Sequence, residues 1–181
     1  MTLSADHRDD RGVSWGNLTL TMGRLRLDGA MEAQDEATAQ SAGRFNKLNL
    51  DAARLHDLAK GWTLYGQVSG QWASKNLDAS EKFALGGPNG VRAWPVGEAL
   101  GDEGLLARLE LRHRLGPAEP YAFFDAGQVR INHTPWTADN NRRSLAGAGL
   151  GMRTNFNDWI LESSIAWRSG NTTDRKSTRL N

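Results

Sequence analysis

The residues of this sequence best suited to chemistry are an arginine and a carboxylate in two separate segments. Arg92 falls in the glycine-rich stretch GGPNGVRAW, and Asp125 falls in the aromatic stretch YAFFDAGQV. A guanidinium and a carboxylate can form a planar, bidentate, charge-assisted contact that a lysine cannot reproduce in the same geometry. Either residue alone would be taken for a solvated charge. Whether either residue takes part in a site therefore depends on the elements that position it.

Other candidate chemistry is thin. Asp102, Glu103 and Glu110 lie near one another, and neighbouring carboxylates can act as an acid/base pair in glycosidases. Asp102 and Glu103 sit in a predicted turn, however, and nothing supplies a paired acid across a cleft. There is no cysteine, and the histidines lack metal-ligand spacing; they are His7, His56, His113 and His133. We expect no enzymatic activity, no cofactor and no metal site.

The composition indicates a protein with little aliphatic core. Hydrophobic residues make up 39%, with 20 glycines, 7 tryptophans and a formal net charge of +1, which gives no bias toward nucleic acid. No apolar run reaches the roughly 18 residues that a transmembrane helix needs. The start MTLSADHRDDRG lacks the apolar stretch of a signal peptide. We therefore expect an exported protein that has lost its true N-terminus.

Alternation with period two predicts antiparallel strands. The clearest segment is GWTLYGQVSGQWAS, in which one face is apolar and rich in tryptophan and the other is polar. The apolar face comprises Trp62, Leu64, Gly66, Val68, Gly70 and Trp72, and the polar face comprises Thr63, Tyr65, Gln67, Ser69 and Gln71. Strands of this kind form the wall of a membrane β-barrel, with lipid outside and water inside.

The pattern recurs along the chain. In LLARLELRHRL the charged residues Arg108, Glu110 and Arg112 share one face, which a water-filled lumen would solvate. Gly147, Gly149 and Gly151 also point inward and suggest close approach by something inside. We predict about seven strands; they cover residues 12–28, 44–57, 61–74, 105–115, 119–131, 144–156 and 159–169. The polar segment 29–42 is predicted to be a long loop, and a short turn at 115–120 contrasts with long connections at 77–102 and 132–141.

The longest connection carries the most specific motif. It contains Val91, Arg92, Ala93 and Trp94, then Gly97, Glu98 and Ala99, then Gly101, Asp102 and Gly104, and it leads into a strand with Glu110 and Leu111. This order resembles the hairpin loop of the haemolysin secretion/activation family, the ShlB/FhaC/HecB-type transporters of two-partner secretion. Ala93 stands where that family has glycine, which adds a methyl group and removes easy access to positive φ.

A second motif supports the resemblance. Phe123, Asp125 and Gly127 match the F-x-D-x-G signature of the same superfamily. The resemblance implies that the loop folds into the barrel and that Arg92 at its tip pairs with Asp125 on the inner wall, as a latch. If the pair is buried, removing one partner would cost about 3 to 5 kcal/mol.

The resemblance further implies a parent protein with periplasmic POTRA domains and a barrel of about sixteen strands in the bacterial outer membrane. Its partners would be a secreted exoprotein of haemolysin or adhesin type, membrane lipid and the barrel assembly machinery. Residues 1–173 would be part of the C-terminal barrel domain, with a last strand after Thr173. The tail 174–181, DRKSTRLN, resembles the translation of a sequencing-library adapter. The alternatives are an outer-membrane assembly factor of the same superfamily, a simple porin, and a soluble β-sandwich module that binds or cleaves carbohydrate.

Overall fold

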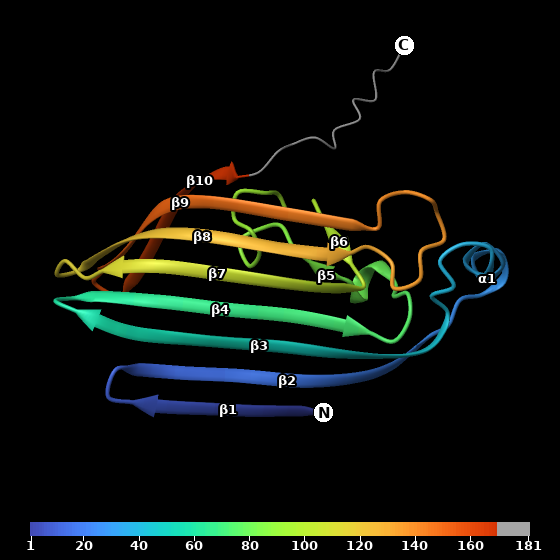
Figure 1. Ribbon diagram of the computed structural model, residues 1–181, viewed down its shortest axis with the longest axis horizontal. Coiled ribbons are helices and arrows are strands. Elements are labelled where there is room, and N and C mark those ends of the chain that lie inside the picture. The colour runs from blue at the N-terminus through green and yellow to red at the C-terminus, as the bar shows by residue number, and fades with distance from the viewer. Residues whose placement is uncertain (170–181) are drawn as a thin grey trace, which may run out of the picture.

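The computed structural model describes residues 1–169, which form one curved antiparallel sheet and a long loop that lies against it (Figure 1). The tail 174–181 and the last strand expected after Thr173 lie outside the described residues. Eight strands make up the main sheet, in the order β1-β2-β3-β4-β7-β8-β9-β10. Their bounds are β1 Thr2–Asp9, β2 Gly12–Leu25, β3 Gly43–Ala59, β4 Trp62–Ala73, β7 Glu103–His113, β8 Ala118–Arg130, β9 Arg142–Phe156 and β10 Trp159–Ser169.

Short turns and long connections lie at opposite ends of the sheet, as predicted. The strands β3 and β4 are joined through Lys60 and Gly61, both with positive φ, as a two-residue hairpin turn of the primed type requires. At the other end lie the connection 26–42, the connection 131–141 and the longest one, residues 74–102, which we call the long loop. In Figure 1 the turns lie at the left and the long connections at the right.

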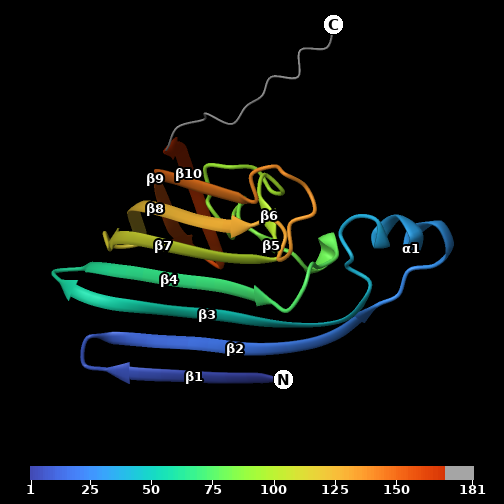
Figure 2. The same cartoon turned by 45° about the vertical axis from the view of Figure 1, so that its right-hand side comes forward.

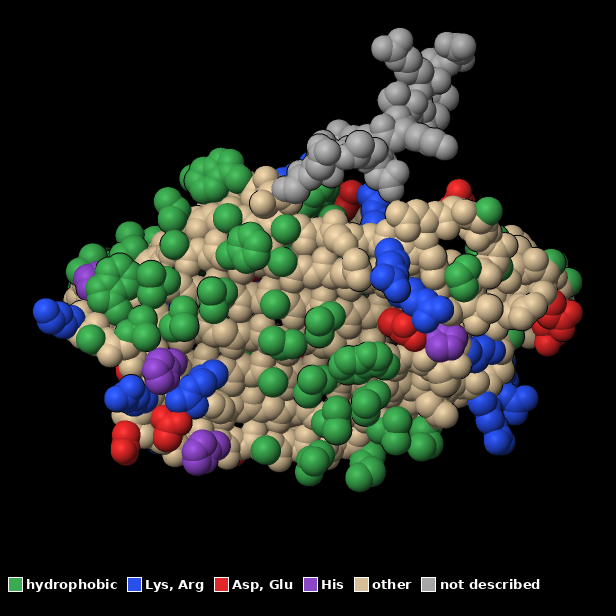
Figure 3. Space-filling view, viewed as in Figure 1, with side chains coloured by type: hydrophobic (Ala, Val, Ile, Leu, Met, Phe, Trp, Pro, Cys, Tyr) green, Lys and Arg blue, Asp and Glu red, His purple; other side chains and the backbone are tan. Residues whose placement is uncertain are grey.

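The two faces of the strands differ as the alternation predicted. On β7, the side chains of Leu105 and Leu109 are about half exposed, whereas Leu106 and Glu110 on the opposite face are almost fully buried. Figure 3 shows hydrophobic side chains spread over the strands, with most charged side chains toward the two ends. We call this apolar surface the outer face, and the surface against which the long loop packs the inner face. An exposed apolar band of this kind is the surface that a barrel presents to lipid.

Two elements differ from the sequence prediction. Residues 2–9 form β1, which pairs with β2 along its whole length although Leu3 and Ala5, both on the outer face, are its only apolar side chains. The turn between β1 and β2 is stabilised by the backbone N–H of Arg11, which donates to the Asp9 carboxylate at 2.9 Å. The predicted loop 29–42 also contains α1 (Gly29–Glu36), whose alanine, methionine, glutamate and glutamine residues are good helix formers.

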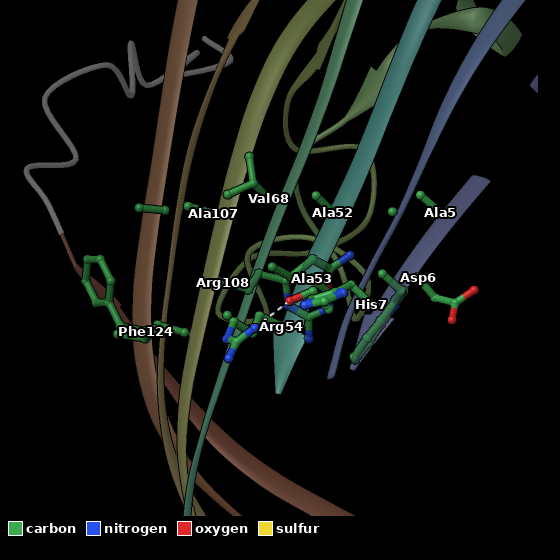
Figure 4. Close-up of a pocket in the computed structure, with 17 residues that line it drawn as sticks. Ala5, Asp6, His7, Ala52, Ala53, Arg54, Val68, Ala107, Arg108 and Phe124 are labelled. Atoms are coloured by element: carbon green, nitrogen blue, oxygen red, sulfur yellow. Dashed lines mark hydrogen bonds between the residues drawn. The ribbon is translucent and has the colours of Figure 1, made fainter. Parts of the chain in front are cut away.

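The sheet is most curved toward its C-terminal strands. Figure 2 shows β8, β9 and β10 turning toward the side on which the long loop lies. On the outer face, a row of mostly small residues crosses five strands at one level, because Gly16, Ala52, Val68 and Ala107 are register partners in turn. Ala5 continues the row on β1. Figure 4 shows Ala5, Ala52, Val68 and Ala107 side by side. No helix in residues 1–169 is long and apolar enough to span a membrane.

The difference between the two faces can be tested with neighbouring residues of β4. We expect Val68→Lys to destabilise the folded barrel by about 2 to 4 kcal/mol, because it places a charge against the hydrocarbon region. Gln67→Lys is the matched control, since its side chain points to the polar inner face. Urea titration of the complete barrel in lipid vesicles measures both values. Equal losses for the two variants would contradict the assignment of the faces.

Candidate functional site

The long loop returns along the inner face rather than projecting from the end of the sheet. It contains a single 3-10 turn, η1 (Ala79–Glu81), and a two-residue pairing of β5 (Phe83–Ala84) with β6 (Leu100–Gly101). Its tip, residues 85–99, is closed by a backbone hydrogen bond from the Val91 N–H to the Leu85 carbonyl at 2.7 Å. A side chain at Gly90 would meet that same carbonyl at 2.1 Å, so this close approach requires glycine.

The tip places Arg92 against Asp125, which lies on β8. The Arg92 Nε atom donates to Asp125 Oδ2 at 2.8 Å and Nη2 donates to Oδ1 at 2.7 Å, a bidentate arrangement. The backbone N–H of Arg92 also donates to Oδ2, at 3.1 Å. The Asp125 side chain is fully buried and that of Arg92 is 9% exposed. The contact is therefore a buried, hydrogen-bonded ion pair between the loop and the inner face.

A second carboxylate shares the same guanidinium. Arg92 Nη1 donates to Glu110 Oε1 on β7 at 2.6 Å, and the other oxygen of Glu110 accepts two hydrogen bonds from Arg112. We call the contacts of Arg92 with Asp125 and Glu110 the clamp. The alternation places Glu110 on the inner face but predicts no partner for it. Only the strand pairing brings it to the clamp, because Glu110 is the register partner of Phe123, two residues from Asp125.

The surroundings of Arg92 keep it charged. Its guanidinium carbon lies 3.6 Å from the centre of the Phe123 ring, a cation–π contact. Burial by itself lowers the pKa of Arg92, but the hydrogen bonds and charges of Asp125 and Glu110 outweigh burial and raise that pKa above its usual value. The clamp therefore holds an arginine that stays protonated and positively charged at neutral pH.

Apolar packing supports the clamp from the side of the long connections. The loop residues Leu85 and Val91 are fully buried, and they belong to a cluster with three inner-face side chains, Leu106, Val129 and Leu145. The sequence predicts a water-filled interior, but this part of the inner face is apolar and buried. Around Leu85 and Val91 the inner face is apolar, so the hydrophobic side chains of the loop are removed from water there.

Glycines on the inner face give the loop room. A Cβ at Gly147 would lie 2.5 Å from the Cβ of Ala93, and a Cβ at Gly127 would lie 2.4 Å from Leu85. The close approach expected at the inward glycines therefore involves the loop at Gly147. At Gly149 and Gly151, the space is instead filled by Phe123 and Tyr121 of β8.

The residues flanking Arg92 attach the tip to the last two strands. The Trp94 indole N–H donates to the Ala146 carbonyl of β9 at 2.9 Å, and Arg168 of β10 lies over the Trp94 ring. Arg168 also donates to the carbonyl of Ala93 at 3.2 Å. Ala93 has no positive φ, so an alanine at this position, in place of the family's glycine, causes no backbone strain.

Asp102 forms a separate anchor at the base of the long loop. Its side chain is fully buried, pairs with Lys82 at 2.8 Å, and accepts hydrogen bonds from the backbone N–H groups of Leu77 and His133. One carboxylate thus joins the start of the loop, its return and the connection 131–141. The sequence places Asp102 in the loop motif but does not predict these partners, which depend on how three connections meet. We call this contact set the base anchor.

The remaining motif residues shape the return of the loop. Gly97 has a φ of +83°, and a side chain at Gly101 would meet the Arg130 carbonyl at 2.5 Å. Gly104 lies against Phe83, where a Cβ would be 2.4 Å from the ring. Glu98 makes a more exposed ion pair with Arg143 at 3.2 Å. Within residues 1–169, no three His, Asp or Glu side chains lie close enough together to hold a metal ion.

A loop returning into a curved sheet, tied through an arginine to a strand aspartate, is the arrangement that the sequence resemblance implied. Residues 1–154 match the family model described as haemolysin secretion/activation protein ShlB/FhaC/HecB. The chain belongs to this family. Accordingly, its sheet is part of an outer-membrane β-barrel of a Gram-negative bacterium.

Similar proteins agree with the family assignment. The heme/hemopexin transporter protein HuxB of Haemophilus influenzae strain Rd is 30% identical over 105 residues, which are 58% of this chain and 19% of HuxB. A second HuxB sequence from Haemophilus influenzae is 36% identical over 76 residues, covering 42% of this chain and 14% of that protein. This ShlB/FhaC/HecB chain therefore spans about a fifth or less of the curated relatives that it matches.

Solved structures show the same fold. CdiB from Escherichia coli matches with a TM-score of 0.66 at 20% identity, over 90% of this chain and 35% of CdiB. CdiB from Acinetobacter baumannii matches with a TM-score of 0.50 at 17% identity, over 93% of this chain and 38% of that one. The β-sandwich alternative is wrong, because all the described strands of this ShlB/FhaC/HecB chain except the short β5 and β6 form one curved sheet with an exposed apolar outer face.

The base anchor can be tested against an exposed ion pair of the same loop. We expect Asp102→Asn to lower the free energy of unfolding by about 3 kcal/mol, because it leaves the Lys82 ammonium in a buried site without its counter-ion. Glu98→Gln, the control, should change it by less than about 1 kcal/mol, because the pair with Arg143 is solvated. Urea titration of the complete barrel in detergent gives both values. A loss for Asp102→Asn no larger than for the control would show that the anchor does not stabilise the loop.

Proposed function

We propose that this segment belongs to a transporter that moves a large exoprotein of haemolysin or adhesin type across the outer membrane in two-partner secretion. The observation that carries the proposal is the clamp, which holds a long loop inside the barrel rather than at its mouth. A loop placed there by a single arginine can close the lumen when it is held and open it when it is released. Membership of the ShlB/FhaC/HecB family supports this function over that of a simple porin or of an assembly factor.

The inner face beside the clamp is suited to an extended polypeptide. A polar groove of about 560 Å³ borders the tip, and Arg112, Tyr121 and Arg153 contribute to its lining. The arginines are paired there: Arg153 with Glu119 and Glu162, and Arg112 with Glu110. Because these arginines already have carboxylate partners, a passing chain would meet hydrogen-bonding groups whose charges are largely paired. Such a surface favours movement over tight binding.

We propose further partners for the complete protein on the basis of the same family membership. The outer face contacts membrane lipid, and the barrel assembly machinery inserts the complete protein. Residues 1–173 form part of the barrel domain, and the POTRA domains expected in the parent protein would receive the exoprotein in the periplasm. No nucleotide is needed at the outer membrane, because folding of the exoprotein outside the cell biases the direction of travel.

The proposed role of the clamp can be tested by secretion. In the full-length transporter, we expect Arg92→Ala to reduce the exoprotein released into the medium by about tenfold or more, because it removes the contacts that place the loop on two buried carboxylates. Arg92→Lys should give an intermediate loss, because lysine keeps the charge but cannot make the bidentate contact. Immunoblots of medium and outer membrane measure secretion per folded transporter.

Arg143→Gln serves as the control, because Arg143 is a loop-facing arginine in an exposed pair with Glu98, outside the clamp. It should secrete as the unmodified transporter does. Normal secretion by Arg92→Ala, at an unchanged level of folded protein in the membrane, would refute the proposed role and favour a simple pore.

A further inference from the structure

A third arginine lies beside the clamp without taking part in it. Arg108 of β7 is the direct register partner of Asp125 on β8, and it is two residues from Glu110 on the same face. Its Nε atom is 3.7 Å from Asp125 Oδ1, and its Nη2 atom is 4.0 Å from Glu110 Oε1. These separations are too long for hydrogen bonds. Within residues 1–169, Arg108 Nε is buried and has no hydrogen-bond partner.

The occupancy of the two nearest carboxylate oxygens explains why Arg108 makes no hydrogen bond to them. Asp125 Oδ1 and Glu110 Oε1, the oxygens nearest to Arg108, are those bound by the two terminal nitrogens of Arg92. The other Glu110 oxygen is bound by Arg112. Arg108 is thus adjacent to two carboxylates whose near oxygens are already occupied by the loop. A buried donor without a partner is costly, and its presence here calls for an explanation.

The charges that the strands place beside the clamp balance without the loop. The strands contribute two cations, Arg108 and Arg112, and two anions, Glu110 and Asp125, all close together. Arg92 therefore adds a third cation to a group that is already neutral. If the tip leaves, the carboxylates need not remain without a counter-ion, because Arg108 is held next to Asp125 by strand pairing and stays there.

We propose that Arg108 is a stand-in counter-ion, which takes over Asp125 and Glu110 when Arg92 leaves the inner face. Its guanidinium needs to shift by only about 1 Å to reach hydrogen-bond distance. The exchange keeps both carboxylates paired in the resting and in the released positions of the loop. Arg108 is therefore a positioning residue that makes release of the tip reversible, and this part of the inference rests on the proposed function.

A thermodynamic cycle in the full-length protein separates this role from that of an ordinary structural ion pair. With Arg92 present, Arg108→Gln should leave the midpoint of thermal unfolding within about 2 °C of the unmodified barrel or raise it, because it removes a cation that faces another cation. In the Arg92→Ala background, the same substitution should lower the midpoint by about 5 °C or more, because Asp125 then loses its last counter-ion. Heat-induced mobility shifts of the detergent-solubilised barrel measure the midpoint.

Three further variants make the test specific to charge. Arg108→Lys in the Arg92→Ala background should restore most of the lost midpoint, and so should Asp125→Asn added to Arg92→Ala/Arg108→Gln, because no unpaired carboxylate remains. Arg114→Gln, which removes an arginine just beyond the end of β7, should have no effect in either background. If Arg92→Ala/Arg108→Gln does not fold while both single variants do, recovery of folding by Asp125→Asn supports the proposal.

Two results would overturn the stand-in role: the same effect of Arg108→Gln with and without Arg92, or no effect in the Arg92→Ala background. The measurement involves no exoprotein, so it stands or falls separately from the secretion assay. If the cycle fails but secretion depends on Arg92 as expected, the proposed function stands without the stand-in role. If the cycle succeeds but secretion does not depend on Arg92, Arg108 is a stand-in counter-ion within a barrel of another function.

Discussion

The structure depends on one guanidinium shared between two buried carboxylates. Arg92 comes from the long loop, whereas Asp125 and Glu110 come from neighbouring strands, so the clamp binds the tip of the loop to two strands at once. A buried ion pair adds little stability over apolar packing, but it imposes geometry, because misplaced charges in a dry site are severely penalised. Much of the inner-face sequence follows from this constraint, including the glycine opposite Ala93 and the aromatic ring beneath Arg92.

Much of this arrangement could be predicted from the sequence, because its signals are local. Alternation predicts seven of the eight main strands and assigns their faces, and the resemblance of the two motifs to the family implies the pairing of Arg92 with Asp125. The features that were missed depend on register and on how separate connections meet. Glu110 and Arg108 are inward by parity, but only the pairing of β7 with β8 places them beside Asp125. β1 was missed because only Leu3 and Ala5 mark its apolar face, which is too short an alternation to predict a strand.

The long loop is held at two places of different character. At its base, Asp102 joins three chain segments through a fully buried carboxylate, and at its tip Arg92 reaches the strands. Between these lies the apolar cluster around Leu85 and Val91. The base is tied to the neighbouring connections and, through Lys47 and Gln71, to β3 and β4, whereas the tip is tied to β7, β8, β9 and β10. A rearrangement that frees the tip can therefore leave the base in place, so that the loop would swing as a tethered arm.

The apolar cluster between the loop and the inner face determines how the loop responds to salt and to temperature. Dissolved salt screens exposed ion pairs such as Glu98 with Arg143 but reaches the buried charges around Asp125 only weakly. Cooling acts on the other component, because the attraction between apolar surfaces weakens as temperature falls. Salinity should therefore leave the loop's position on the inner face almost unchanged, while cold weakens it through the contacts of Leu85 and Val91.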